Sequence, residues 1–211
     1  MGINHIIWDW NGTLLNDIDV SVKIVNQLLK NRGLPAISLQ HHRQFFRFPI
    51  QQYYEKLGFN FSKESFQSLS ENYIGRYLKL IHQAPLQRAA TKILKTFQRM
   101  GIGQSLLSAM EKNILFKMVR KFKLESFFQK IVGIDNFRAD SKLNQGKRFI
   151  EQRTESPRQI LMIGDTEHDL EVARVMGCQC ILFSGGHQTG KKLKLLGVPV
   201  ISRLAKVLDY V

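Results

Sequence analysis

The stretch INHIIWDWNGT, at residues 3–13, decides the fold of this chain. Its first part, residues 3–8, is a short apolar run with the length and composition of a buried β-strand. Asp9 follows this run directly, and Gly12 permits the chain to leave the strand through a tight turn. The sequence therefore predicts a buried strand that ends in a carboxylate, at the rim of a sheet.

A second stretch repeats this arrangement later in the chain. It is QILMIGDTEHD, at residues 159–169, where an apolar run at residues 159–163 is followed by Asp165 and Asp169. The carboxyl ends of parallel strands open on a shared crevice near the point where the strand order reverses. We therefore expect the carboxylates of Asp9, Asp165 and Asp169 to converge.

Apolar runs and helical patterns alternate through the later part of the chain. Further strands are expected at residues 103–107, 130–134, 178–183 and 198–201. Helices are expected at residues 88–100, 111–122, 143–154, 167–176 and 203–210. Strands that alternate with helices form a parallel sheet covered on both faces. The pattern predicts an α/β fold with a Rossmann-like parallel sheet flanked by helices.

The segment that follows the first strand has a different pattern. Helical periodicity runs through it, at residues 20–30, 39–46, 50–57 and 63–81, with no strand pattern of comparable strength. Pro85 marks the return to alternating strands and helices. We expect two domains: an α/β core at residues 1–15 and 85–211, and an inserted all-helical cap at residues 16–84.

The composition is that of a soluble globular protein. Of the 211 residues, 44% are hydrophobic and 23% are charged. No apolar run approaches the roughly 20 residues that a membrane-spanning helix needs, so no membrane partner is expected. Cys178 and Cys180 are separated by one residue, which is a poor spacing for a disulfide. We interpret them as core residues of a cytoplasmic protein.

The net charge of +14 is the unusual feature of the composition. A positive field favours anionic partners. The basic residues are spread over several helical patterns, and we interpret them as solvated helix faces. Because no recognised nucleic-acid motif is present, nucleic acid is not expected as a partner. A small phosphorylated metabolite is the expected partner, bound by a monomer or a homodimer.

The residue types at the predicted crevice suit phosphate chemistry. Asp9 can coordinate a cation with one carboxylate oxygen and attack phosphorus with the other. Mg²⁺ prefers oxygen ligands, which Asp165 and Asp169 would add. Crowding three carboxylates without a cation would be electrostatically costly. The sequence therefore predicts a Mg²⁺-dependent attack on a phosphate ester.

Four further side chains are expected to contact the substrate. Thr13 lies in the turn after Asp9, Ser108 follows a predicted strand, and Lys142 lies in a polar segment after another strand. A hydroxyl and an ammonium group there can hold the non-bridging phosphate oxygens. Arg47, in the cap segment, is the candidate for recognising the rest of the substrate. His187 lies in a glycine-rich loop after a strand, where it could line the crevice, but we interpret it as a surface residue.

These motifs, in this order, resemble the four signature motifs of the haloacid dehalogenase superfamily. They are DWNGT at residues 9–13, LLS ending at Ser108, Lys142, and GDTEHD at residues 164–169. The helical segment at residues 16–84 is similar to the cap that such enzymes carry between the first and second motifs. Phosphoglycolate-phosphatase-like members have the most similar layout, which implies a phosphatase.

The resemblance also implies a role for each matching residue. Asp9 would be the nucleophile that forms an aspartyl-phosphate. Ser108 and Lys142 would bind the phosphoryl oxygens, and Lys142 would steady the nucleophile, with Lys147 as a competing candidate. The expected Mg²⁺ site consists of Asp9, the main-chain carbonyl of Asn11 and Asp165, with Asp169 either a further ligand or a partner of the ligands.

Asn11 departs from the family pattern, which usually has a second aspartate at this position as general acid and base. An asparagine cannot transfer a proton near neutral pH, and such help is typically worth about 10²–10⁴-fold. A catalytically weak phosphate-binding or regulatory protein is therefore an alternative hypothesis. A 2-haloacid dehalogenase is a third, but related dehalogenases lack the acidic arrangement of Asp165 and Asp169. Glu167 and His168 are further candidates for the proton transfer.

Overall fold

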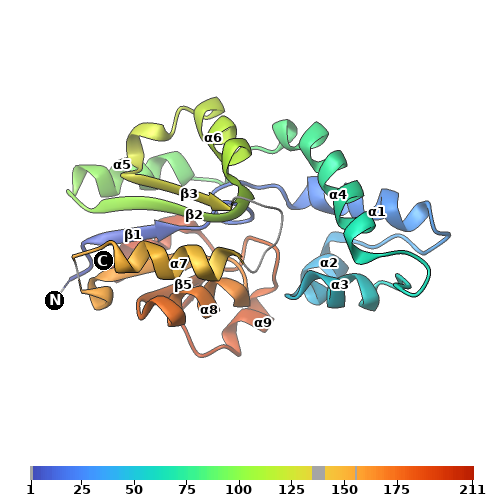
Figure 1. The fold of residues 1–211 in the computed structure, drawn as a ribbon. Helices are drawn as coiled ribbons and strands as arrows, with labels where there is room; N and C mark the ends of the chain where they lie inside the picture. Colours follow the sequence, from blue (N-terminus) through green and yellow to red (C-terminus); the bar gives the residue numbers. More distant parts are fainter. Residues whose placement is uncertain (1, 135–140, 155) are drawn as a thin grey trace.

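The computed structural model describes residues 2–134, 141–154 and 156–211. The described residues form a six-stranded parallel sheet in the order β3-β2-β1-β4-β5-β6 (Figure 1). The strands are β1 (His5–Trp8), β2 (Gly103–Glu111), β3 (Lys130–Ile134), β4 (Ile160–Gly164), β5 (Gln179–Phe183) and β6 (Val200–Ile201). The prediction of a parallel α/β sheet is confirmed.

Strand β1 lies inside the sheet and positions the site. Trp8, its last residue, is in register with Leu106 of β2 and with Ile163 of β4. Just beyond the strand, the Asp9 main-chain N–H donates to the Ile163 carbonyl at 2.9 Å. Because β1 and β4 end side by side, the residues that follow them enter the same space.

Helices cover both faces of the sheet (Figure 1). They are α5 (Ala90–Arg99), α6 (Lys112–Lys121), α7 (Ser141–Glu151), α8 (Glu167–Met176) and α9 (Gly190–Lys194). Side chains alternate along β1, as a strand requires. Ile6 and Trp8 pack in a core cluster with buried residues of α5 and α6, whereas Ile7 packs with buried residues of α7 and α8. The continuous apolar character of β1 thus follows from burial on both faces.

Four helices lie together beyond the carboxyl ends of the strands, on one side of the molecule (Figure 1). They are α1 (Ile18–Lys30), α2 (Leu39–Phe45), α3 (Ile50–Lys56) and α4 (Phe66–Leu80). No strand interrupts residues 16–84. None of the helices in the described part of the chain combines the length and apolar character that a bilayer crossing requires.

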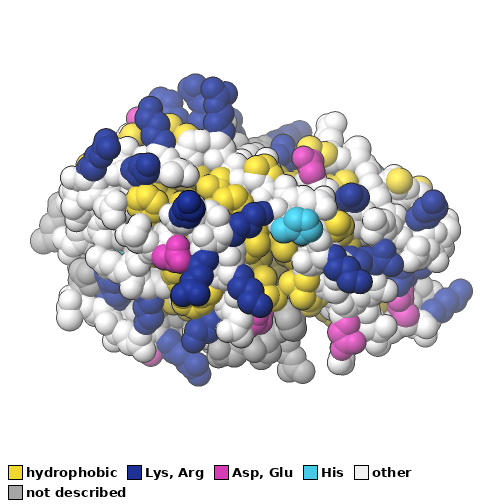
Figure 2. Space-filling model, turned by 90° about the horizontal axis from the view of Figure 1, so that it is seen from above, with side chains coloured by type: hydrophobic (Ala, Val, Ile, Leu, Met, Phe, Trp, Pro, Cys, Tyr) yellow, Lys and Arg dark blue, Asp and Glu magenta, His cyan; other side chains and the backbone are white. Residues whose placement is uncertain are grey.

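On the face of the molecule seen in Figure 2, the basic side chains lie at many separate places rather than in one patch. Figure 2, which looks down on the molecule from above the view of Figure 1, shows Lys and Arg separated by other side chains. On α5 and α6 the basic residues are exposed while the apolar residues between them are buried or half-buried. This placement fits solvated faces of amphipathic helices.

Three details of the predicted elements need correction. Strand β2 does not end at residue 107 but continues to Glu111 past an irregularity in its pairing with β3, so Ser108 lies within the strand. The segment Leu204–Tyr210 is a 3₁₀-helix, in which buried Leu204 and Val207 have the three-residue spacing of that helix. Helix α9 was not expected from the pattern.

Candidate active site

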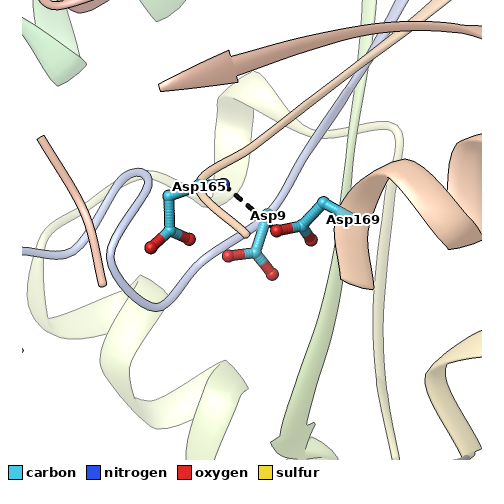
Figure 3. Close-up of side chains that lie close together, drawn as sticks. All are labelled: Asp9, Asp165 and Asp169. Carbon is cyan, nitrogen blue, oxygen red and sulfur yellow. Dashed lines mark hydrogen bonds between the residues drawn. The ribbon is translucent and has the colours of Figure 1, made fainter. Parts of the chain in front are cut away.

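Three buried carboxylates meet where β1 and β4 end. Asp9 follows β1, Asp165 follows β4, and Asp169 lies in the first turn of α8. Each offers an oxygen atom, and these oxygens all lie within 4.8 Å of one another (Figure 3). All three residues are buried. The two strand ends therefore bring together the acidic side chains that the sequence singles out.

Lys142 is the cation of this cluster. Its Nζ donates to Asp9 Oδ1 at 2.5 Å and to Asp169 Oδ1 at 2.6 Å. Burial opposes its charge, but Asp169 and Asp9 raise the pKa of Lys142 above its ordinary value. Lys147, the competing candidate, lies on the same helix and is exposed. The structure thus places Lys142, rather than Lys147, against the expected nucleophile.

Asp169 is fully engaged with protein groups. Its Oδ1 accepts from Lys142, and its Oδ2 accepts from the Asp165 N–H at 3.1 Å and from the Thr166 N–H at 3.0 Å. The Thr166 hydroxyl donates to the same oxygen at 2.7 Å. Burial acts against the charged form, yet Lys142 and Thr166 hold the pKa of Asp169 below its ordinary value. Asp169 therefore fixes both Lys142 and the turn that carries Asp165.

Asp165 lies in a cradle of backbone and small residues. Its Oδ1 accepts from the Thr13 hydroxyl at 3.1 Å, and its Oδ2 accepts from the His187 N–H at 2.5 Å. A Cβ atom built on Gly12 would lie 2.3 Å from Asp165 Oδ2, and one built on Gly186 would lie 2.1 Å from it. Glycine is needed at both positions because they press directly on this carboxylate. Thr13 uses its side chain here to hold Asp165.

The charges of the cluster are unbalanced. Three carboxylates lie close together, and one ammonium group, that of Lys142, binds two of them. Burial, with the neighbouring Asp169 and Asp165, raises the pKa of Asp9 to about 8, although Lys142 acts in the opposite direction. Burial also raises the pKa of Asp165 to about 7. A compact set of carboxylate oxygens with excess negative charge is the donor set that a hard divalent cation such as Mg²⁺ prefers, so the residues present fit this ion.

Asn11 is held by residues that the sequence analysis did not identify. Its Nδ2 donates to Asp17 Oδ2 at 2.9 Å and to the Tyr77 hydroxyl at 2.6 Å. Tyr77, from α4, donates to the same Asp17 oxygen at 2.6 Å. Asp17 Oδ1 accepts from the Gly12 N–H at 2.8 Å. An aspartate directly before a helical pattern suggests only an N-cap.

The expectation that His187 is a surface residue is wrong. The residue is only 6% exposed, because its loop folds back so that its N–H can bind Asp165. Its Nε2 lies 3.3 Å from Asp17 Oδ1, and its Nδ1 lies 3.1 Å from Nε2 of His42 in α2. Burial works against its charge, but Asp17 raises the pKa of His187 above its ordinary value. The glycine residues around it allow this close approach.

The predicted substrate-binding residues Ser108 and Arg47 differ in how they are connected to the site. Ser108 is buried, and its hydroxyl donates to Asn11 Oδ1 across a long 3.5 Å contact. Arg47 is half-buried, between Phe46, whose ring is 4.9 Å from that of His187, and Phe48. No hydrogen bond or ion pair joins Arg47 to another described residue. The structure thus joins Ser108 to the site and leaves Arg47 in the neighbouring loop.

The fold and the site together define the class of protein. The chain belongs to the haloacid dehalogenase-like hydrolase family, whose model matches residues 6–183. The expected resemblance is thereby confirmed.

Individual relatives narrow the comparison. A phosphoglycolate phosphatase from Aliivibrio fischeri is 22% identical over 204 residues, covering 90% of this chain and 88% of its own length. A phosphoglycolate phosphatase from Pseudomonas savastanoi is 21% identical over 197 residues, covering 89% and 72% respectively. The chain is thus a member of a hydrolase family, and these relatives are phosphatases.

Solved structures share the fold over the full length. A predicted phosphatase from Clostridium acetobutylicum superposes with a TM-score of 0.82 at 18% identity, covering 99% of this chain and 98% of that one. A haloacid dehalogenase-like hydrolase from Streptococcus pneumoniae gives a TM-score of 0.81 at 19% identity, with the same coverage. At such identities these likenesses describe the fold alone.

Proposed function

We propose that this protein is a Mg²⁺-dependent phosphatase that hydrolyses a small phosphate monoester through an aspartyl-phosphate at Asp9. The observation that carries this proposal is the convergence of the buried carboxylates of Asp9, Asp165 and Asp169, the first and last of which bind Lys142. Buried charges are normally paired or coordinate a metal, and this cluster has one lysine for three carboxylates. The curated relatives, which are phosphoglycolate phosphatases, support the same reaction class.

The proposed Mg²⁺ site draws on four residues, whose roles differ. Asp9 and Asp165 would each give a carboxylate oxygen, and the Asn11 main chain would give its carbonyl. Asp169, with both oxygens already engaged, would hold Lys142 and the Asp165 turn in place. When bound, the cation neutralises the excess negative charge and polarises a phosphoryl oxygen.

The reaction has two halves, and the chain's own residues act in both. In the first, an Asp9 oxygen attacks phosphorus, the bond between phosphorus and the leaving oxygen breaks, and the leaving oxygen takes a proton from solvent. In the second, water attacks the same phosphorus, the bond to Asp9 breaks, and the water proton passes to solvent. Lys142 steadies the Asp9 carboxylate, and Ser108 and Lys142 bind the phosphoryl oxygens. Asn11 cannot donate a proton to the leaving oxygen. The rate of the first step should therefore be lowered least for substrates with good leaving groups.

Residues 16–84 form, in this proposal, a cap domain that selects the substrate. The loop after α2 is one of the places where this segment contacts the core. The Phe48 ring stacks on His168 at 4.6 Å between centroids, and the Phe46 carbonyl accepts from Gln188 at 3.0 Å. In this proposal the guanidinium of the half-buried Arg47, which belongs to the same loop, binds the non-reacting part of an anionic metabolite. A short acid such as phosphoglycolate is a suitable first candidate.

A cytoplasmic location completes the proposal. Both cysteines are free thiols, as the chemistry of a reducing compartment favours. Burial raises the pKa of Cys178 to about 12, which keeps this thiol protonated and unreactive. A monomer or a homodimer would carry out the reaction.

Asn11 favours a second candidate function. The site would then bind phosphate and become phosphorylated, without efficient turnover, and act as a regulatory module. Tight Mg²⁺-dependent binding of beryllium fluoride, together with absent phosphate release, would favour this function over hydrolysis.

A phosphatase assay with matched variants tests the main proposal. Phosphate release from p-nitrophenyl phosphate and phosphoglycolate is measured with and without Mg²⁺, for the wild-type chain and for Asp9→Asn. Asp19→Asn, an equal charge change on an exposed position of α1, is the control. We expect Mg²⁺-dependent release that Asp9→Asn abolishes and Asp19→Asn retains. Release that survives Asp9→Asn contradicts the proposal.

A further inference from the structure

A buried carboxylate stands next to the one side chain that departs from the family pattern. Asp17 is 2% exposed and lies at the start of α1, the N-cap position, but its side chain makes no capping bond to that helix. It points instead toward the turn that carries Asn11 and Gly12, and it accepts bonds from both. A buried carboxylate that does not bind the main-chain N–H groups of its helix needs other hydrogen-bond donors.

Four donors from three parts of the chain meet on Asp17. Asn11 and Gly12 come from the turn after β1, Tyr77 comes from α4, and His187 comes from the loop after β5. Burial acts against its charge, yet His187 and its other partners hold the pKa of Asp17 below its ordinary value. Asp17 thus connects α4, the loop after β5 and the turn after β1.

The hydrogen bonds fix the direction of the Asn11 amide. Its two N–H donors face the Asp17 carboxylate and the Tyr77 hydroxyl oxygen. The reverse orientation would set the amide oxygen against a carboxylate and is unfavourable. Consequently the carbonyl oxygen of the side chain faces the opposite way, toward Ser108.

We propose that Asp17 and Tyr77 are positioning residues that hold the Asn11 amide with its oxygen facing the reaction space, where it orients the attacking water. The proposal rests on the phosphatase function proposed above. Asn11 then contributes hydrogen-bond acceptance rather than proton transfer, and its orientation depends on the docking of α4. Position 11 itself has no carboxylate, but the carboxylate of Asp17 lies beside it and acts through Asn11.

The first test is a double-mutant cycle with Tyr77→Phe, which removes one hydroxyl and keeps the ring. Losing an outer partner that orients a group at a metal site typically costs about 10–100-fold in metal affinity or activity. We expect a kcat loss of this size in the wild-type background. In an Asn11→Ala background the same change should alter kcat by less than about twofold, since the effect passes through Asn11. Equal losses in both backgrounds overturn the proposal.

Tyr73→Phe is the matched control for this cycle. Tyr73 lies one turn earlier on α4, stacks on Tyr77 and donates to Ser21 rather than to Asn11 or Asp17. Its exchange removes the same hydroxyl group from the same helix. We expect an unchanged kcat, whereas a loss equal to that of Tyr77→Phe would show that any change in this helix suffices.

A reciprocal exchange tests the pairing of positions 11 and 17. Asn11→Asp alone sets two carboxylates where an amide and a carboxylate now lie 2.9 Å apart, so we expect kcat to fall. Adding Asp17→Asn restores one amide and one carboxylate, and we expect kcat to recover to at least the wild-type value. A rise in kcat from Asn11→Asp alone, or no recovery in the pair, contradicts the proposal.

An NMR measurement keeps this proposal separate from the function on which it rests. The side-chain amide of Asn11 is assigned by its absence in Asn11→Ala, and its proton exchange is measured in the full chain. We expect slow exchange in wild type and fast exchange in Tyr77→Phe. Fast exchange in wild type overturns the positioning. A chain without Mg²⁺-dependent phosphatase activity would refute the function, and this measurement would still decide the positioning.

Discussion

Asp9 and Lys142 are the pair on which the site depends at the scale of single residues. Lys142 is the only cation that contacts Asp9 and Asp169 among the described residues, and it is almost fully buried. Two carboxylates lose their partner if it is replaced. Removing one member of a buried ion pair typically costs about 3–5 kcal/mol of stability.

Lys142→Met should therefore damage both stability and activity. We expect the free energy of unfolding of the metal-free protein to fall by about 3–5 kcal/mol. We expect kcat to fall by about 10²–10³, the usual cost of one lost electrostatic donor. Urea denaturation and the phosphatase assay measure these changes. Lys147→Met, exposed on the same helix, is the control, and equal effects from both would refute the assignment.

The raised pKa values of Asp9 and Asp165 predict how Mg²⁺ stabilisation depends on pH. In the unfolded chain these carboxyl groups lose their protons near pH 4. In the metal-free folded state they keep them to about 8 for Asp9 and about 7 for Asp165. The folded state binds more protons in this window, so the stability of the metal-free protein falls as pH rises through it.

Mg²⁺ binds the deprotonated carboxylates and should reverse this loss. We expect saturating Mg²⁺ to raise Tm more at about pH 9 than at about pH 6, as measured by differential scanning calorimetry. Asp9→Asn should remove most of this pH-dependent difference. An equal Mg²⁺ effect at both pH values would contradict the pKa shifts.

At the scale of elements, the turn after β1 is shaped to admit Asp165. Gly12 has a φ of +75° and would press a Cβ to within 2.3 Å of the Asp165 carboxylate. Gly101 has a similar φ of +73°, but nothing lies within 4 Å of its Cβ position. Both glycines have a left-handed backbone conformation, but only Gly12 lies against the site.

Comparing Gly12→Ala with Gly101→Ala separates these two effects. Each should lose about 1–2 kcal/mol of stability because of its left-handed backbone. Only Gly12→Ala should also lose Mg²⁺ binding and activity, since it displaces Asp165. Isothermal titration with Mg²⁺ measures the difference. Intact Mg²⁺ binding in Gly12→Ala would show that the turn does not shape the metal site.

The sequence predicts the parts of the site that belong to strand ends, because that geometry follows from the pattern of strands. Asp9 and Asp165 are of this kind. Asp17, Tyr77 and His187 could not be found in the same way, since their meeting depends on how the helical segment packs on the core. Such long-range packing leaves no local periodic signal. An aspartate before a helix and a histidine between glycines each have an ordinary local explanation.

At the scale of the whole molecule, the net charge of +14 should assist the binding of an anionic substrate. The basic residues that produce this positive field lie on several helices, so they attract the substrate from a distance rather than by direct contact. Salt screens such long-range attraction. Raising the ionic strength from about 0.1 M to 1 M shortens the screening length from about 10 Å to 3 Å.

We therefore expect kcat/KM for a phosphate ester to fall several-fold with added salt at saturating Mg²⁺, while kcat stays nearly constant. Steady-state kinetics over a salt series, at fixed pH, measures both quantities. A kcat/KM that does not respond to salt would show that the basic surface has no part in substrate capture.

The convergence of two strand ends on one shared cation is the claim on which the function depends. A crystal structure of the protein with Mg²⁺ and beryllium fluoride tests it most directly. We predict Mg²⁺ at about 2.0–2.1 Å from carboxylate oxygens of both Asp9 and Asp165, with the fluoride adduct on Asp9. Mg²⁺ bound elsewhere, or beryllium fluoride that avoids Asp9, would contradict the account.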